Sequence, residues 1–132
     1  MATTAAEFIN GMRPTETFGM EITEAADGRA TARLPLQEEF CFDGRGSPVV
    51  HGAATFALAD NAGAAAVMSG FAEPEPAFTI DLRIDYLDAA TTDLTAEAAV
   101  LRHGSVIGVA DVAVEDADGD VVAVARGTYR SA

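Results

Sequence analysis

The sequence predicts an α+β fold in which an antiparallel β-sheet wraps around one long central helix. Three observations lead to this prediction. Segment 51–68 is apolar almost all round, so a helix there needs other structure on every side. A segment with β-hairpin signals precedes it, and several segments of alternating polarity follow it. Each alternating segment offers one apolar face, and the long helix is what those faces would cover.

A short helix is expected first, over about residues 4–12, ended by Pro14. We expect residues 1–14 to form a peripheral segment of a single domain that spans residues 1–132. That length allows one compact core and is too short for two.

Two strands are expected next, over 18–24 and 29–34, joined by the turn signal Asp27-Gly28. The following stretch, 37–48, is expected to be irregular because Gly and Pro residues interrupt it.

Gly70 is expected to end the central helix, and a Glu-Pro repeat should keep the chain extended up to the next strand. In the segment that follows, Phe78, Ile80, Leu82, Ile84 and Tyr86 alternate with polar residues, so this apolar set is predicted to face the helix. The four strands expected in this part of the chain cover 77–87, 94–102, 106–115 and 121–129.

The composition argues against several classes of partner. The net charge is −13 and all eight basic residues are Arg, so nucleic acid and anionic membranes should be repelled. An acidic surface without Lys suits a high-salt cytoplasm, where salt screens the self-repulsion. The N-terminus lacks a signal-peptide pattern, and no apolar stretch suits a membrane span, so we expect a cytoplasmic protein. The lone Cys41 predicts neither a disulfide nor a metal site.

Asp60 is the only carboxylate in the apolar helix, where just Thr55 and Asn61 also carry polar side chains. Burying an unpaired charge is costly, and a carboxylate kept in such a place often has a chemical role. The alternative is that Asp60 lies on a narrow solvent-facing stripe or is satisfied by nearby backbone amides.

With this helix in place, the chain resembles the hotdog-fold acyl-CoA thioesterases, in particular the phenylacetate-pathway type and the related 4-hydroxybenzoyl-CoA group. The resemblance runs from about residue 18 to 129 and is most specific in His51-Gly52-Ala53 and Leu58-Ala59-Asp60-Asn61-Ala62. It implies acyl-CoA hydrolysis by a homodimer, or by a homotetramer of two dimers. No cofactor is expected, since coenzyme A is part of the substrate, and no metal.

Thioester hydrolysis needs stabilisation of a developing oxyanion and an activated nucleophile. The Gly52 N–H at the helix N-terminus is the candidate oxyanion donor. Asp60 would be the nucleophile or the general base that activates water, as its counterpart is in the family. Eight residues of helix place the two about 12 Å apart, so a shared bond requires Gly52 of one subunit and Asp60 of another. We also expect Arg83 to face an acid across that two-fold axis.

The remaining candidates are assigned to substrate binding, each beside a plainer structural interpretation. His51 either contacts substrate or bonds the loop backbone, and Thr79 either places the water or is an ordinary strand residue. Asn61 either orients the Asp60 carboxylate or has only a capping role. Arg102 and Ser105 lie near a turn that meets the nucleotide of CoA in relatives, where Arg102 would bind phosphate; the alternative is a solvated turn.

Two further candidates for substrate binding, Ala53 and Arg45, depart from the family pattern. Ala53 replaces a second glycine, which crowds the approach to the helix end. Arg45 stands where relatives usually have Asn or Gln, so either Asp43 or Ser47 takes that role through a shifted loop or the activity differs.

Three functions follow from these residues. The first is acyl-CoA hydrolysis. The second is a non-catalytic acyl-CoA binding or sensing module, favoured by the altered loop. The third is a hydratase or dehydratase, which would need a catalytic histidine, and the sequence offers only His51 and His103.

Four phenylalanines near the helix would suit a short or aromatic acyl group: Phe40, Phe42, Phe56 and Phe71.

Overall fold

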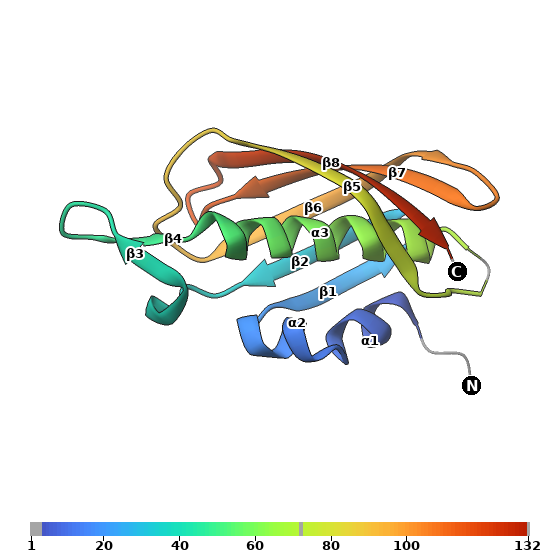
Figure 1. The fold of residues 1–132 in the computed structure, drawn as a ribbon, viewed down its shortest axis with the longest axis horizontal. Coiled ribbons are helices and arrows are strands. Elements are labelled where there is room, and N and C mark those ends of the chain that lie inside the picture. Colours follow the sequence, from blue (N-terminus) through green and yellow to red (C-terminus); the bar gives the residue numbers. More distant parts are fainter. Residues whose placement is uncertain (1–3, 72, 132) are drawn as a thin grey trace.

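A computed structural model describes residues 4–71 and 73–131 and has the predicted α+β architecture (Figure 1). Six antiparallel strands form one sheet in the order β1-β2-β6-β7-β8-β5, wrapped around helix α3 (Gly52–Ser69). The hotdog arrangement expected from the sequence is therefore confirmed. The strands are β1 (Glu21–Ala26), β2 (Arg29–Leu34), β5 (Ala77–Tyr86), β6 (Leu94–His103), β7 (Ile107–Glu115) and β8 (Val121–Ser131).

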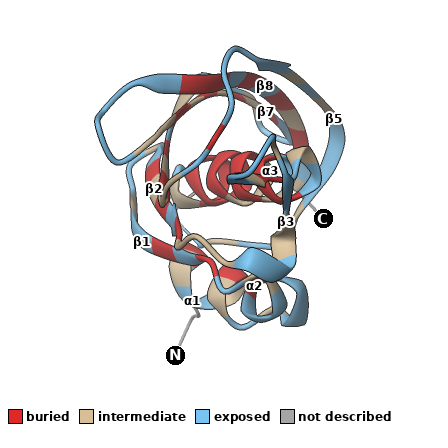
Figure 2. Ribbon diagram, turned by 90° about the vertical axis from the view of Figure 1, so that its left-hand side faces the viewer, coloured by how far each residue is buried: buried red, intermediate tan, exposed pale blue. Residues whose placement is uncertain are grey.

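Helix α3 is the centre of the core, as the end-on view in Figure 2 shows. Most of its buried side chains are alanines, and their small size lets the surrounding strands approach the helix closely. The largest fully buried side chain around it is Tyr129 of β8. Within the described residues, no helix is long and apolar enough to cross a membrane.

The first hairpin has the predicted turn. Asp27 and Gly28 have φ angles of 52° and 81°, the left-handed values that a two-residue type I′ turn requires. Strand β1 begins at Glu21 rather than Phe18, because a helix occupies the preceding residues.

The N-terminal segment differs from the expectation. It forms two helices, α1 (Ala5–Asn10) and α2 (Arg13–Phe18), and Pro14 lies in the first turn of α2, where proline is tolerated. Both helices lie beneath α3 at the opening of the curved sheet (Figure 2). Because Ile9 and Thr15 are buried, this segment is part of the core packing and not peripheral.

The stretch predicted to be irregular also contains regular structure. A 3-10 turn, η1 (Glu38–Phe40), leads into a small hairpin of β3 (Cys41–Asp43) and β4 (Pro48–Val50), which projects from the body (Figure 1). The Gly44 N–H donates to the Ser47 carbonyl oxygen at 2.8 Å and closes its turn. The glycines that suggested a loop thus form a hairpin turn.

Strand β5 contains a β-bulge at Ile80, which alternation alone could not reveal. Thr79 pairs with Tyr129 and Asp81 with Thr128, so Ile80 is an extra residue without a partner. Leu82 and Ile84 face the core as predicted. The predicted apolar face does not hold at Phe78 and Ile80, which are both exposed. Just before the bulge it is Thr79 that points towards α3.

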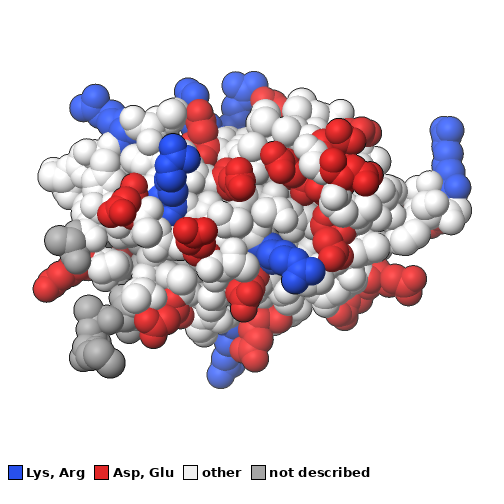
Figure 3. Space-filling model, turned by 180° about the vertical axis from the view of Figure 1, so that it is seen from behind, with Lys and Arg blue, Asp and Glu red and all other residues white. Residues whose placement is uncertain are grey.

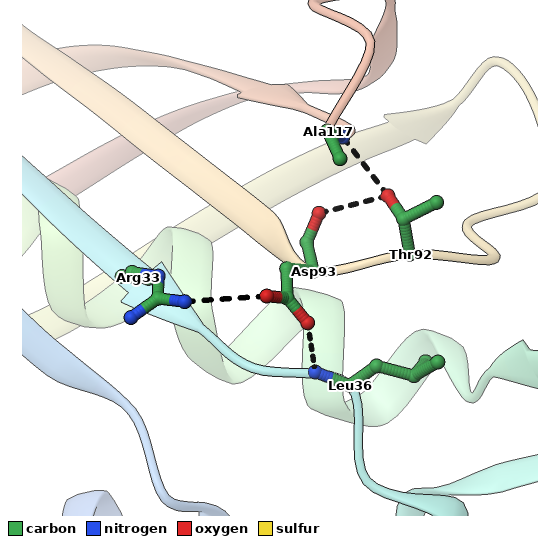
Figure 4. A network of polar contacts seen from close by, with 5 residues as sticks. All are labelled: Arg33, Leu36, Thr92, Asp93 and Ala117. Carbon is green, nitrogen blue, oxygen red and sulfur yellow. Dashed lines mark hydrogen bonds and ion pairs between the residues drawn. The ribbon is translucent and has the colours of Figure 1, made fainter.

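A polar network connects three loops near the start of α3 (Figure 4). The Asp93 carboxylate accepts the Leu36 N–H at 2.7 Å and an Arg33 N–H at 3.2 Å. The Thr92 hydroxyl accepts the Ala117 N–H at 2.9 Å. These bonds fix the chain where it leaves β2 for the segment that leads to α3.

Asp93→Ala is expected to lower the free energy of unfolding by about 1–2 kcal/mol, because the Leu36 N–H loses its acceptor. Asp93→Asn keeps an acceptor oxygen and removes only a half-exposed ion pair, so it should cost less than half as much. Urea denaturation of both variants measures the difference. Equal losses would show that the charge, and not the bond to Leu36, stabilises this corner.

Candidate active site

The start of α3 presents an unpaired N–H group. His51 is the N-cap, and its Nδ1 atom accepts the Ala53 N–H at 2.9 Å. The His51 carbonyl oxygen accepts the N–H groups of Ala54 and Thr55. Among the residues that the structure describes, the Gly52 N–H has no acceptor. It is therefore free to bind an oxygen at the positive end of the helix dipole.

Tyr86 lies against this helix end, and the sequence interpretation missed it. Its hydroxyl donates to the Gly52 carbonyl oxygen at 2.8 Å. A Cβ atom added to Gly52 would lie 3.2 Å from the Tyr86 Cζ atom, so glycine allows this close contact. In the sequence Tyr86 appeared only as the last apolar residue of an alternating strand.

Asp60 is half-buried about two turns further along α3. The Thr79 hydroxyl donates to its Oδ1 atom at 2.8 Å, and the Tyr129 hydroxyl donates to its main-chain oxygen at 3.2 Å. Burial raises the pKa of Asp60 above its usual range, while hydrogen bonds from Thr79 and Tyr129 lower it. The carboxyl group is thus partly desolvated and bonded to the Thr79 hydroxyl, with the Tyr129 hydroxyl on the main chain of the same residue. Such an environment is typical of a tuned acid or base.

One face of α3 joins the two groups. Gly52, Phe56 and Asp60 are four residues apart and so lie in one row along the helix. Strand β5 runs beside this row, with Tyr86 at the Gly52 end and Thr79 at the Asp60 end. Since β5 is the last strand of the sheet, the row lies at an open sheet edge.

Three of the predicted binding residues make contacts within the chain. His51 and the Ala53 N–H bond each other as the helix cap. The Asn61 side chain donates to the Thr15 hydroxyl at 3.0 Å, which ties α2 to α3 and points away from the Thr79 side. The role of these three residues in substrate binding stays a prediction.

The three other predicted residues lie away from Asp60. Arg45 is exposed in the turn of the β3–β4 hairpin, with a φ of 60°. Arg102 is exposed near the end of β6, and Ser105 lines a hollow of about 460 Å³ by the β6–β7 turn. His103, between them, lies 3.2 Å from the Val67 carbonyl oxygen near the C-terminal end of α3. Within one chain, none of them meets the acid.

The four phenylalanines do not line one pocket. Phe40 packs against Phe18 with ring centroids 4.9 Å apart, and Phe71 packs against His103 at 4.2 Å. Phe42 and Phe56 are exposed, and Phe56 is one turn before Asp60 on the same row. Of these four, Phe56 is the one placed within a single chain to contact an acyl group near the acid.

A six-stranded antiparallel sheet around a single long helix, with this row of residues at its edge, defines a hotdog-fold protein. The model of the thioesterase superfamily matches residues 48–123, and the chain belongs to this family. Membership supports the hydrolysis of a thioester or an ester.

Individual relatives agree with this assignment. A Halobacterium salinarum protein named "Putative esterase" is 40% identical over 86% of this chain and 80% of its own length. A solved structure of a thioesterase-superfamily protein has a TM-score of 0.87 at 30% identity and covers 97% of this chain and 96% of that one. The Escherichia coli PaaI protein from the phenylacetic acid degradation operon has a TM-score of 0.83 at 25% identity, over 95% and 88%.

Proposed function

We propose that the protein hydrolyses an acyl-CoA thioester to a free acid and coenzyme A. The observation that carries this proposal is the pairing of an unpartnered Gly52 N–H with a half-buried Asp60 on the same helix. The Gly52 N–H would bind the thioester oxygen as negative charge develops on it. Asp60 would attack the carbonyl carbon or take a proton from an attacking water.

The chemistry requires no group beyond the substrate and water. The bond between the acyl carbon and the sulfur breaks, and a bond from the same carbon to a water oxygen forms. The thiolate of coenzyme A receives a proton, and the acyl group leaves as a carboxylate. Both routes open to Asp60 end in these products, and they differ in whether an acyl-aspartyl intermediate forms first.

The active site is proposed to form between two subunits. Gly52 and Asp60 of one chain are about 12 Å apart along α3, too far to act on one carbonyl group. Strand β5 is a free sheet edge, and Phe78, Ile80, Tyr86 and Leu87 beside that edge are each more than half exposed. An exposed apolar edge favours pairing with another strand. A two-fold axis there would bring Gly52 of the partner subunit towards Asp60.

Arg83 is available for the cross-subunit contact expected from the sequence. Its guanidinium lies 3.4 Å from the Asp85 carboxylate in the same strand, and its side chain is 79% exposed. An ion pair as exposed as this one contributes little to the stability of the single chain. Arg83 is therefore free to pair with an acid of the partner subunit when two chains associate.

The outer face of the sheet is the surface proposed for joining two dimers into a tetramer. It carries a groove of about 820 Å³, and acidic and arginine side chains are interspersed across the molecule seen from behind (Figure 3). The strand register aligns charged residues in two neighbouring rows across the sheet, one mainly basic and one acidic. The basic row of one dimer can therefore face the acidic row of another. The basic row contains Arg29, Asp111, Arg126 and Arg83, and the acidic row contains Glu97 and Asp85.

The positions of the histidines give no support to a hydratase or dehydratase. His51 caps the start of α3, and His103 contacts the Val67 carbonyl oxygen near its other end. A non-catalytic binding module would keep the same row of residues on α3, and activity measurements distinguish it.

A panel of acetyl-, hexanoyl-, phenylacetyl-, 4-hydroxybenzoyl- and palmitoyl-CoA tests the proposal by release of free thiol. We expect the highest kcat/KM with a short or aromatic acyl group, because Phe56 alone borders the acid on an otherwise small-residue row. Palmitoyl-CoA should be the poorest substrate. Tight binding of a panel member without turnover of any would establish the binding module instead.

A further inference from the structure

Tyr129 occupies a slot made by two glycines. Its side chain is fully buried on β8, and its hydroxyl reaches the main-chain oxygen of Asp60 at 3.2 Å. A Cβ atom added to Gly127 would lie 2.5 Å from that hydroxyl, and one added to Gly63 would lie 2.9 Å from the Tyr129 Cζ atom. Any larger residue at either position would displace the tyrosine from the acid. Both glycines therefore keep a phenol beside Asp60.

A purely apolar core would not require that hydroxyl. A buried hydroxyl without an acceptor is costly, so a phenylalanine would fill the same space with less risk. The carbonyl of Asp60 lies inside α3, where a helix already supplies its usual donor four residues later. The Tyr129 hydroxyl is thus an additional donor, directed at one particular residue of the helix.

We propose that Tyr129 is a positioning residue for Asp60: its hydroxyl holds that turn of α3 and, with Thr79 on the opposite strand, supports the ionised carboxylate. This inference rests on the proposed catalytic role of Asp60. The two hydroxyls come from residues that pair across the neighbouring strands β8 and β5, so one side of the sheet presents both to Asp60.

The electrostatics add an effect of the Tyr129 hydroxyl on the carboxyl group, beside its bond to the main-chain oxygen of Asp60. Burial raises the pKa of Asp60, and the only other groups that shift it among the described residues are the hydroxyls of Thr79 and Tyr129, which lower it. The neighbouring Asn61 is turned towards Thr15. Burial and the nearby Asp60 raise the pKa of Tyr129 itself, so the phenol stays protonated and able to donate across the neutral range.

The test is Tyr129→Phe, with the Asp60 carboxyl titrated by ¹³C NMR without substrate and kcat/KM measured across pH. Both the NMR pKa and the acid limb of the pH profile should move to higher pH. Below neutral pH, kcat/KM should fall about tenfold, the effect of one lost hydrogen bond. Tyr86→Phe is the matched control, because it removes a phenol from the other end of α3, and the pKa of Asp60 should not change.

An unchanged pKa of Asp60 in Tyr129→Phe, whatever the loss of stability, would overturn the proposal and leave Tyr129 a packing residue. If that variant does not fold, 3-fluorotyrosine at position 129 keeps the shape and makes the phenol a stronger donor. The pKa of Asp60 should then move to lower pH, and no movement would overturn the proposal equally. Because the titration needs no substrate, it remains informative even if Asp60→Asn kept full activity and so disproved the proposed function.

Discussion

Asp60→Asn is expected to reduce kcat for the best acyl-CoA substrate by about a thousandfold, because an amide is a poor base and a poor nucleophile. The substitution is nearly isosteric, and the amide oxygen can still accept the Thr79 hydroxyl. Substrate affinity should therefore change little. Steady-state kinetics combined with binding of a non-hydrolysable acyl-CoA thioether separates the two quantities.

The same variant should be at least as stable as the wild type at neutral pH. Burial raises the pKa of Asp60 in the folded protein, so its ionised form is disfavoured there relative to the unfolded chain. This cost is present above the folded-state pKa and disappears as the pH falls through it and the carboxyl group takes up a proton. Removing the charge should remove the cost. An inactive variant with an unchanged or higher Tm would show that the loss is chemical, whereas retained activity would exclude Asp60 from catalysis.

Two inactive variants are expected to restore activity when they share a dimer. Gly52→Pro removes the free N–H but should keep the helix, because Gly52 is the first helical residue, where proline is tolerated. His51, with φ −62° and ψ 139°, already has the conformation that a following proline requires. A mixed dimer with Asp60→Asn would then contain one intact site and one doubly altered site.

Random reassociation should form about half mixed dimers and so recover about a quarter of the wild-type activity. The subunits would be mixed in urea and refolded, and the dimer verified by light scattering. Gly52→Ala is the matched control, since it adds a similar contact with Tyr86 yet retains the N–H, and it should remain active alone. A mixture as inactive as its components would place the whole site within one chain.

Much of this fold could be predicted because its central signal is local. A helix that is apolar on every side must be covered by other structure on every side. The structure places this helix at Gly52–Ser69, within a residue or two of the predicted 51–68. The later strands were equally clear, since alternation and Asp- or Gly-rich turns mark each one. Turn chemistry also identified the first hairpin at Asp27-Gly28.

The errors arose where tertiary contacts decide between local alternatives. Pro14 suits both the end of one helix and the first turn of the next, and burial of Thr15 against α3 favours the second. Gly44 and Gly46 suit both a loop and a hairpin turn. In neither case does the local sequence contain the neighbour that settles the choice.

The candidate site could be predicted only in part for a similar reason. Asp60 and Gly52 were identifiable from their helix and from the resemblance. Tyr86 and Tyr129 were not, because each reads as an ordinary strand residue, and their contacts with α3 depend on strand order. The fit of Tyr129 between Gly63 and Gly127 joins residues that are far apart in sequence, and spacing within one element cannot reveal it.

The bulge in β5 also bears on how this chain can vary in length. Ile80 has no counterpart in β8, so the strand is one residue longer than its ladder requires. Removing that residue would leave Thr79 and Leu82 on the faces they now occupy, opposite Tyr129 and Gly127. Insertions and deletions are usually confined to loops. Here the register predicts that a one-residue deletion inside a strand keeps both faces, one residue from the hydroxyl that contacts Asp60.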